Sequence, residues 1–299
     1  MIVAIVALPI AASSQTTKPA VPPGKAAAPV AGIFPEGTVV YNNVPYHDDT
    51  LQKHQLDLYL PAGRKGNVPV IVWIHGGAWR SNDKYADMGY MKQTIREILA
   101  SGYAIASVDY LFSTSAVFPA QLYDCLNAVS FLYISSAKYG LDKNRIGLMG
   151  FSAGGHLASL LGLQSNNMEK KPPYRIRAVV DFYGPSDFIA ISSSADTAAN
   201  NDRSAVAVLL GAKPNDRPDL ARAASPVAYV DEHDPPFLII HGEKDDMVPV
   251  TQSVLLASWL RLKGVQQELV VVPGAPHYGE MFDAPAVRQK VIAFIKKNI

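Results

Sequence analysis

The prediction of the fold starts from residues Arg145–His156, which read RIGLMGFSAGGH. An apolar run that ends at Met149 is typical of a buried strand, and the residues after Gly154 have a helical pattern. Between them lies GFSAG, a G-x-S-x-G pentapeptide centred on Ser152. Glycines on both sides of a serine allow a turn so tight that the hydroxyl is pushed out beyond the sheet. An ordinary glycine-rich turn can share this pattern, but the strand–turn–helix context favours a nucleophilic serine.

The composition is typical of a globular protein that does not bind nucleic acid. The chain has 299 residues, of which 48% are hydrophobic and 18% charged, and its net charge is +1. This length fits one large α/β domain. Because no basic cluster is present, nothing could neutralise a run of phosphates, so we expect no nucleic-acid binding. The single cysteine, Cys125, excludes an internal disulfide framework or cysteine-based zinc site, and we expect a buried, inert thiol.

The N-terminal residues resemble an export signal. Met1–Ala12 is apolar but too short to span a bilayer, so we expect no stable membrane insertion. Small residues follow it, and we predict a signal peptide over residues 1–14 and a secreted or periplasmic protein, although the usual positive charge at the start is missing. Residues 15–36 are rich in Ala and Pro and are predicted to be a flexible linker. The alternative is a cytoplasmic tail.

From residue 37 to residue 299 the pattern is that of one folded domain with a mainly parallel sheet. Two segments alternate apolar and polar residues, which predicts antiparallel strands at a sheet edge, and six more are continuous apolar runs typical of fully buried strands. In order, the eight are Val39–Tyr46, His54–Leu60, Val68–Ile74, Tyr103–Tyr110, Arg145–Met149, Ala178–Tyr183, Pro236–Ile240 and Glu268–Val272.

Segments of helical period separate these strands, so we expect helices on both faces of the sheet. The clearest is Pro119–Tyr139, and Ser253–Lys263 and Ala286–Lys297 are similar. Residues 184–222 break the alternation and are predicted to form a small, weakly helical lid or cap. In sheets of this kind a ligand binds beyond the carboxyl ends of the strands, which is where partners for Ser152 should lie.

His277 is the best candidate for the general base that a serine nucleophile needs. It follows the last predicted strand directly, at the carboxyl edge of the sheet. The other histidines are placed less well. His47 and His54 belong to the edge hairpin, His233 precedes a strand, His156 lies within the helix after Ser152, and His75 and His241 end strands in loops with other roles.

The orienting acid should follow the preceding strand, in the chain order Ser, Asp, His. The stretch HGEKDDMVP after residues 236–240 offers Glu243, Asp245 and Asp246, and position alone does not separate the two aspartates. Asp181 and Asp187 are weaker alternatives.

Backbone donors for an oxyanion are predicted at two places. One is the N–H of Ala153, at a helix N-terminus directly after Ser152. The other is the loop His75–Trp79, HGGAW, which follows a buried strand and whose glycines let backbone N–H groups approach a ligand closely.

Together these motifs resemble the α/β-hydrolase superfamily. HGGAW, GFSAGGH, HGEKDDMVP and the loop PGAPH occur in the order found there, and more narrowly they resemble carboxylesterases of the hormone-sensitive-lipase and feruloyl or acetyl-xylan esterase type. The resemblance implies an eight-stranded, mostly parallel sheet with an antiparallel N-terminal edge and a small lid. It also implies Asp245 as the acid, and Gly77, Ala78 and Ala153 as oxyanion donors.

The chain departs from the family pattern at two places. Ala78 stands where many lipase-type relatives have a third glycine, a change that keeps the backbone donor and narrows the pocket slightly. Leu111-Phe112 stands where relatives often have an arginine, which leaves the acyl specificity open.

We therefore predict a serine esterase that needs no cofactor. No histidine–carboxylate cluster with metal-ligand spacing and no phosphate-binding loop is evident. Trp79 and Tyr278 are candidates for stacking on a sugar or aromatic acyl group, or for packing the walls of the site. The expected substrates are small acyl esters, including acetyl or feruloyl groups on plant polysaccharide. The alternatives are a serine peptidase, an arylformamidase or a non-catalytic binding module.

Overall fold

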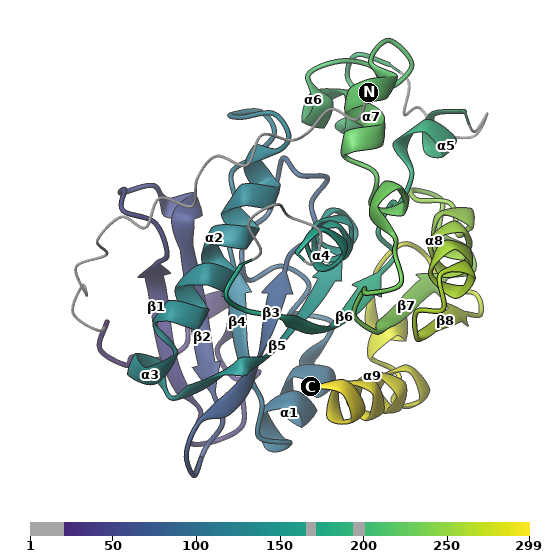
Figure 1. Ribbon diagram of the computed structural model, residues 1–299. Helices are drawn as coiled ribbons and strands as arrows, with labels where there is room; N and C mark the ends of the chain where they lie inside the picture. Colours follow the sequence, from purple (N-terminus) through teal and green to yellow (C-terminus); the bar gives the residue numbers. More distant parts are fainter. Residues whose placement is uncertain (1–20, 166–171, 194–200) are drawn as a thin grey trace.

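The fold is built on one eight-stranded sheet, which contains all eight predicted strands (Figure 1). The structure is a computed structural model that describes residues 21–165, 172–193 and 201–299. Along the sheet the strands lie in the order β1-β2-β4-β3-β5-β6-β7-β8. Their bounds are β1 Val39–Pro45, β2 Gln55–Leu60, β3 Val68–Ile74, β4 Ala104–Val108, β5 Leu141–Phe151, β6 Ile176–Phe182, β7 Phe237–Gly242 and β8 Gln267–Val272.

The strand directions confirm a mostly parallel sheet with an antiparallel N-terminal edge. β1 pairs antiparallel with β2, and β2 pairs antiparallel with β4. From β4 through β3, β5, β6 and β7 to β8 every pairing is parallel. This is the α/β-hydrolase fold, and it brings the loops after β3, β5, β7 and β8 to one edge of the sheet.

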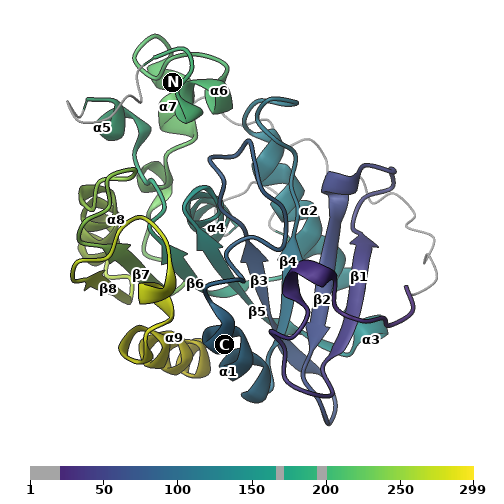
Figure 2. The ribbon, with the colours of Figure 1, turned by 180° about the vertical axis from the view of Figure 1, so that it is seen from behind.

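Helices cover both faces of the sheet (Figures 1 and 2). The helices α1 (Lys92–Ala100) and α9 (Pro285–Asn298) pack together on one face, and α2 (Ala120–Ile134), α4 (Ala153–Gln164) and α8 (Thr251–Leu262) supply core residues on the other. Within the described ranges, no helix combines the length and apolar character needed to cross a membrane.

The helix predicted over residues 119–139 is two helices, because the chain leaves helical geometry at Ser135 (φ −88°, ψ 8°). The short α3 (Ser136–Tyr139) follows and ends at Gly140, which has the left-handed φ of 67°. A glycine adopts this conformation without steric cost, and the chain then enters β5.

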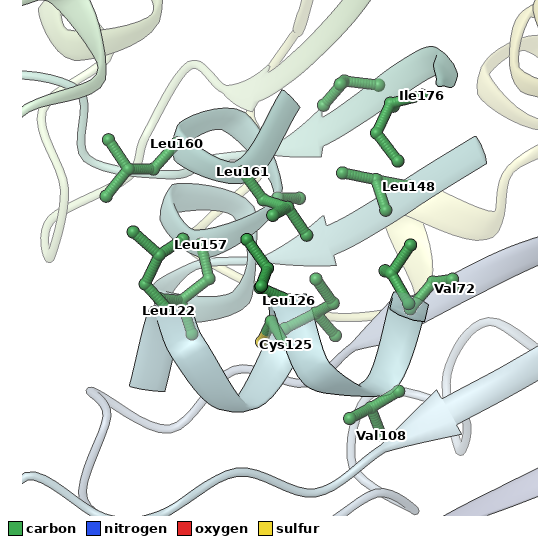
Figure 3. Close-up of a cluster of buried hydrophobic side chains, with 14 of the residues drawn as sticks. Val72, Val108, Leu122, Cys125, Leu126, Leu148, Leu157, Leu160, Leu161 and Ile176 are labelled. Atoms are coloured by element: carbon green, nitrogen blue, oxygen red, sulfur yellow. The ribbon is translucent and has the colours of Figure 1, made fainter. Parts of the chain in front are cut away.

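The core has two halves because successive residues of each buried strand point to opposite faces. In β3, Val72 contributes to one half and Trp73 to the other. Figure 3 shows strand side chains such as Val72 and Leu148 packed against apolar side chains of α2 and α4. Cys125 of α2 is buried in this half, and burial raises the pKa of its thiol well above the usual value, as expected for an inert thiol.

The described part of the segment predicted as a linker packs on the domain. Val30 and Ile33 are buried, the N–H of Gly24 bonds to the carbonyl of Val40, and Arg96 of α1 donates to the carbonyl of Ile33. The apolar residues of this Pro/Ala-rich segment therefore add to the core, and the described part of the segment is not the flexible linker that its composition predicts. The signal peptide predicted over residues 1–14 lies outside the described residues and stays a prediction, as does the secreted or periplasmic location.

The segment predicted as a cap contains short helices that gather at one end of the molecule (Figures 1 and 2). They are α5 (Phe188–Ser193), α6 (Ala205–Leu210) and α7 (Pro218–Ala223), and residues 194–200 between them lie outside the described ranges. The segment is tied to the domain, since the N–H of Phe118 bonds to the carbonyl of Leu209 and the Phe188 ring is buried against that of Trp79.

Candidate active site

Ser152 lies on a strained turn between β5 and α4. Its φ of 52° and ψ of −116° are unfavourable for a residue with a side chain. A Cβ atom at Gly150 would lie 2.0 Å from the carbonyl oxygen of Gly154, and one at Gly154 would lie 2.0 Å from that of Ile74. The G-x-S-x-G pattern is therefore required sterically, because the turn folds tightly on itself at Gly150 and passes over the end of β3 at Gly154.

The structure brings Ser152, His277 and Asp245 together. His277 Nε2 lies 2.8 Å from Ser152 Oγ, and His277 Nδ1 lies 2.6 Å from Asp245 Oδ2. Since an ionised carboxylate can only accept, Nδ1 carries the proton and Nε2 is the acceptor for the serine hydroxyl. His277 is 4% exposed, so its hydrogen bonds are shielded from water. This is the arrangement of a serine nucleophile with its base and orienting acid.

Asp245 is held as a buried carboxylate. Its side chain is 0% exposed and accepts hydrogen bonds from the backbone N–H groups of Met247 and Val248. His241 Nε2 lies 3.1 Å from the same Oδ2 that faces His277. Burial raises the pKa of the Asp245 carboxyl, but the hydrogen bonds from His241 and His277 outweigh burial, so the pKa falls below its usual value. The carboxylate is therefore ionised at neutral pH.

The other candidate acids have different partners. Glu243 accepts from the backbone N–H of Gly274, and Asp187 accepts from the N–H groups of Ile189 and Ala190 in α5. Asp181 accepts from Ser159 and the N–H of Gly184, while Asp246 is exposed. Among the described carboxylates, the one that bonds to His277 is Asp245, which resolves the choice that position in the sequence left open.

Three of the remaining histidines hold loops around the site. His241 Nε2 faces the carbonyl of Val248 as well as Asp245, and its Nδ1 faces Ser253 Oγ, so it braces the acid loop as expected. His156 and His75 are fully buried, and burial lowers the pKa of each ring to about 4, so both are neutral at pH 7.

The loop after β3 has the conformation that exposes backbone donors. Gly77, Ala78 and Trp79 all have positive φ, of 122°, 52° and 58°. A Cβ at Gly77 would lie 2.4 Å from the carbonyl oxygen of Ser81, so this position needs glycine. Within the described chain, the N–H groups of Gly77 and Ala78 donate to no acceptor. Ala153 is the first residue of α4, where N–H groups lack helical partners and the helix dipole favours negative charge.

A network that the sequence did not indicate supports this loop. Asp87 accepts from the N–H of Gly76 (2.8 Å) and from the hydroxyl of Tyr90 (2.5 Å), and this hydroxyl lies 2.8 Å from that of Tyr183. The ring centroid of Tyr183 is 4.8 Å from that of His277. The network thus joins the HGGAW loop to the base. No motif or period marks Asp87, because its role depends on a turn that only the folded chain creates.

The two aromatic candidates are placed differently. Trp79 is 3% exposed, and its indole N–H donates to His156 Nδ1 at 3.2 Å. Its ring therefore packs the wall of the site and is not available to stack on a substrate. Tyr278 is 61% exposed, with its ring edge-on to that of His277 at 6.1 Å. Phe151 is buried in the core.

The described residues also contain one cluster of histidines and a carboxylate that could bind a metal ion, which the sequence analysis did not predict. His47, Asp49 and His54, on the connection between β1 and β2, each place a potential ligand atom within 4.8 Å of the others. The spacing of these three residues in the sequence does not indicate a metal site, because a turn, and not a helix or a strand, brings their side chains together.

Comparison with known proteins gives one family. The BD-FAE family model matches residues 56–260. Esterase LipQ of Mycobacterium tuberculosis is 30% identical over 267 residues, which are 84% of this chain and 60% of that protein. Esterase LipC of the same organism is 30% identical over 269 residues, 85% of this chain and 64% of that protein. The chain thus spans about 60% of the length of these curated relatives.

Two solved structures are similar at the level of both fold and sequence. A truncated form of a carbohydrate esterase from gut microbiota is 31% identical with a TM-score of 0.79, and the match covers 88% of this chain and 98% of that one. A bifunctional GH43-CE protein of Bacteroides eggerthii is 34% identical with a TM-score of 0.78, covering 86% of this chain and 35% of that one.

Proposed function

The chain belongs to the BD-FAE family of α/β-hydrolase carboxylesterases, and from this premise we propose that it hydrolyses carboxylic esters through an acyl-enzyme on Ser152. The observation that carries the proposal is the continuous hydrogen-bonded chain from Ser152 Oγ through His277 to Asp245. A serine hydroxyl is a poor nucleophile unless an adjacent base accepts its proton.

In the first half of the reaction Ser152 Oγ attacks the ester carbonyl while His277 Nε2 takes the hydroxyl proton. The resulting imidazolium is stabilised by Asp245, which also keeps the imidazole in the tautomer that leaves Nε2 free to accept. The N–H groups of Gly77, Ala78 and Ala153 are the donors for the oxyanion of the tetrahedral intermediate. His277 then gives its proton to the leaving alcohol, and the acyl group remains on Ser152.

In the second half a water molecule replaces the alcohol. His277 takes a proton from this water as it attacks the acyl carbonyl, and the same N–H groups stabilise the second oxyanion. Collapse of the intermediate breaks the bond to Ser152 Oγ, which recovers its proton from His277. No step requires a group other than the ester, water and these residues.

The test of this activity is labelling with a fluorophosphonate, which reacts with activated serines. We expect stoichiometric modification of Ser152, and the peptide that carries the label identifies the residue. A folded protein that stays unlabelled would favour the alternative of a non-catalytic binding module.

For the substrate, we propose esters of small acyl groups, such as acetyl or feruloyl groups on plant polysaccharide. The two similar structures are a carbohydrate esterase and a GH43-CE protein by their own descriptions, which supports a carbohydrate ester. The exposed Tyr278 beside His277 offers an aromatic surface on which a sugar ring or an aromatic acyl group can stack.

A substrate panel separates these possibilities. It contains nitrophenyl esters of increasing chain length, acetylated and feruloylated xylan, a peptide amide and N-formylkynurenine. We expect the highest kcat/KM for acetyl or feruloyl esters, with release from the polysaccharide. A preference for butyryl or longer chains without release from either xylan would overturn the substrate proposal, and faster turnover of the amide or formamide would favour a peptidase or an arylformamidase.

A further inference from the structure

Three metal-binding side chains converge at the connection between β1 and β2, outside the candidate active site. His54 Nδ1 lies 2.5 Å from Asp49 Oδ2, and His47 Nδ1 lies 3.4 Å from the same oxygen. The centroids of the two imidazole rings are 4.7 Å apart, and the ring planes are tilted by 31°. Two imidazole nitrogens and one carboxylate oxygen thus lie within 4.8 Å of one another.

The buried ring of this group is oriented as metal-binding histidines usually are. His54 is 6% exposed, and its other nitrogen, Nε2, lies 3.2 Å from Asp124 Oδ1. Asp124 is itself buried and is fixed by the N–H of Leu111, which donates to Oδ2 at 2.8 Å. The nearby Asp124 carboxylate favours a proton on Nε2 electrostatically, which leaves the lone pair of Nδ1 available to a metal.

The other two side chains can be reached from solvent. The side chain of His47 is 42% exposed and that of Asp49 is 34% exposed. Around a tetrahedral Zn²⁺ with bonds of about 2.0–2.1 Å, ligand atoms lie roughly 3.3 Å apart. The His47–Asp49 separation of 3.4 Å already has this value, and the pair His54–Asp49 would open slightly to admit an ion.

We propose that His47, Asp49 and His54 form a binding site for a divalent transition-metal ion, with Zn²⁺ as the best match. Two imidazole nitrogens and one carboxylate suit zinc, whereas calcium and magnesium prefer oxygen ligands alone. Three protein ligands leave one position for water from the exposed side.

The bound ion would join the end of β1 to the start of β2. His47 lies just beyond β1, and His54 directly precedes β2, whose first residue, Gln55, accepts a hydrogen bond from the N–H of Asp109 beyond β4. A metal that cross-links this connection stabilises the folded state in proportion to its occupancy. We therefore infer a structural role at the antiparallel edge of the sheet, separate from ester hydrolysis.

The test uses tag-free, full-length protein stripped of metal with EDTA and then titrated with Zn²⁺ by calorimetry, alongside thermal melting. His47→Ala removes a ligand that is exposed, so the variant should fold, and His233→Ala removes another exposed histidine as the matched control. We expect one Zn²⁺ per chain and a higher melting temperature for the unmodified protein and for His233→Ala. His47→Ala should bind at least about tenfold more weakly, since even the loss of an outer-shell partner costs 10- to 100-fold.

Zinc-edge X-ray absorption of the 1:1 complex identifies the ligands, and we expect a signal from two imidazoles. The proposal is overturned if the unmodified protein binds no zinc, if His47→Ala binds as tightly as the unmodified protein, or if the spectrum lacks imidazole. In any of these cases His54 is simply a ring held between Asp49 and Asp124.

Discussion

At the scale of single residues, the surroundings of Asp245 explain why this carboxylate, and not one of its neighbours, orients His277. Its neighbour Asp246 is exposed, while the Asp245 side chain is buried and contacts His277, His241 and two backbone N–H groups. The adjacent aspartates therefore differ in environment and not in chemistry, and this makes Asp246 a natural control for Asp245.

We predict that Asp245→Asn lowers kcat by about 10⁴ because the amide cannot hold His277 in the required tautomer. Asp246→Asn should stay within about twofold of the unmodified protein, since an exposed carboxylate in a loop contributes little. Steady-state kinetics on a nitrophenyl ester measures both. Equal losses in the two variants would show that the loop, and not the Asp245–His277 contact, determines the rate.

Asp87 acts one step further from the reacting atoms, as a positioning residue. By accepting from the N–H of Gly76 it fixes the start of the loop whose next residues offer the oxyanion donors. We predict that Asp87→Ala lowers kcat about tenfold, the equivalent of about 1.4 kcal/mol in activation free energy, with little change in KM.

Tyr90→Phe is the control for Asp87→Ala, because it removes one hydroxyl and leaves the Gly76–Asp87 bond in place. Its effect on kcat should be smaller. An unchanged kcat in Asp87→Ala, with a lower melting temperature, would reduce Asp87 to a stabilising residue.

At the scale of elements, the site is made where β5 meets α4 and crosses the end of β3. The approach is so close that a Cβ atom at Gly150 or Gly154 would lie 2.0 Å from a backbone carbonyl oxygen. The N–H of Ser152 also donates to the carbonyl of Phe182, which ties the turn to the end of β6. The nucleophile is therefore held by three strands and one helix.

Gly154→Ala should test this packing. The added methyl would lie 2.0 Å from the carbonyl oxygen of Ile74, and we expect a loss of about 1–3 kcal/mol in the free energy of unfolding, together with most of the activity. Gly89→Ala, where nothing lies within 4 Å, is the matched control and should be neutral. Urea unfolding measures both, and a stable, active Gly154→Ala would mean that the turn is not sterically constrained.

The strands and most of the candidate catalytic residues could be predicted from the sequence. Two patterns made the eight strands predictable: apolar–polar alternation indicated β1 and β2, and continuous apolar runs such as Val68–Ile74 indicated the other six. β8 differs from the expected full burial, because it lies at the edge of the sheet and is only partly buried. Ser152 and His277 were predictable because each follows a strand at the edge where parallel strands end. The choice of Asp245 needed the resemblance to a family, since its neighbour has the same position and chemistry.

The features that were missed depend on contacts between distant segments. Asp87 and the group around His54 lie in turns without periodicity, and their partners are set by the folded chain. The packing of Val30 and Ile33 on the domain was not predicted, because the composition around these two residues is typical of a linker. Local pattern reports burial in strands and helices well, but it does not report which loops meet.

At the scale of the whole molecule, buried neutral histidines connect the layers. His156 of α4 accepts from the indole of Trp79 in the HGGAW loop and faces the carbonyl of Ala224 beyond α7 (2.7 Å). His75 is stacked on Tyr110 and donates within the same loop. The His156 ring thus joins α4, the HGGAW loop and the chain directly after α7.

This arrangement makes stability depend on pH. The pKa of His156 and of His75 is about 4 in the folded chain because of burial, compared with 6.5 when unfolded. Below pH 6.5 the two unfolded-state imidazoles therefore bind protons that the folded ones do not. The contribution of these neutral rings to stability is thus fully present above pH 6.5 and is lost progressively toward pH 4.

His156→Gln isolates one of these protons, because an amide offers one donor and one acceptor, as the neutral ring does, and does not titrate. We expect the free energy of unfolding of this variant to fall less steeply between pH 6.5 and pH 4, by about one proton in the linkage slope. Urea unfolding across this range measures it. If the free energy of unfolding has the same pH dependence in His156→Gln and in the unmodified protein, residues other than His156 take up the proton.

The most direct measurement of the central claim is the turnover of a short-chain nitrophenyl ester by Ser152→Ala, compared with the unmodified protein at equal concentration. The substitution removes one oxygen at the elbow, and circular dichroism checks that the fold is kept. Loss of the nucleophile should lower kcat by about 10⁶, as in a protease that uses the same three side chains. Turnover within tenfold of the unmodified protein would contradict the proposal that Ser152 attacks the ester.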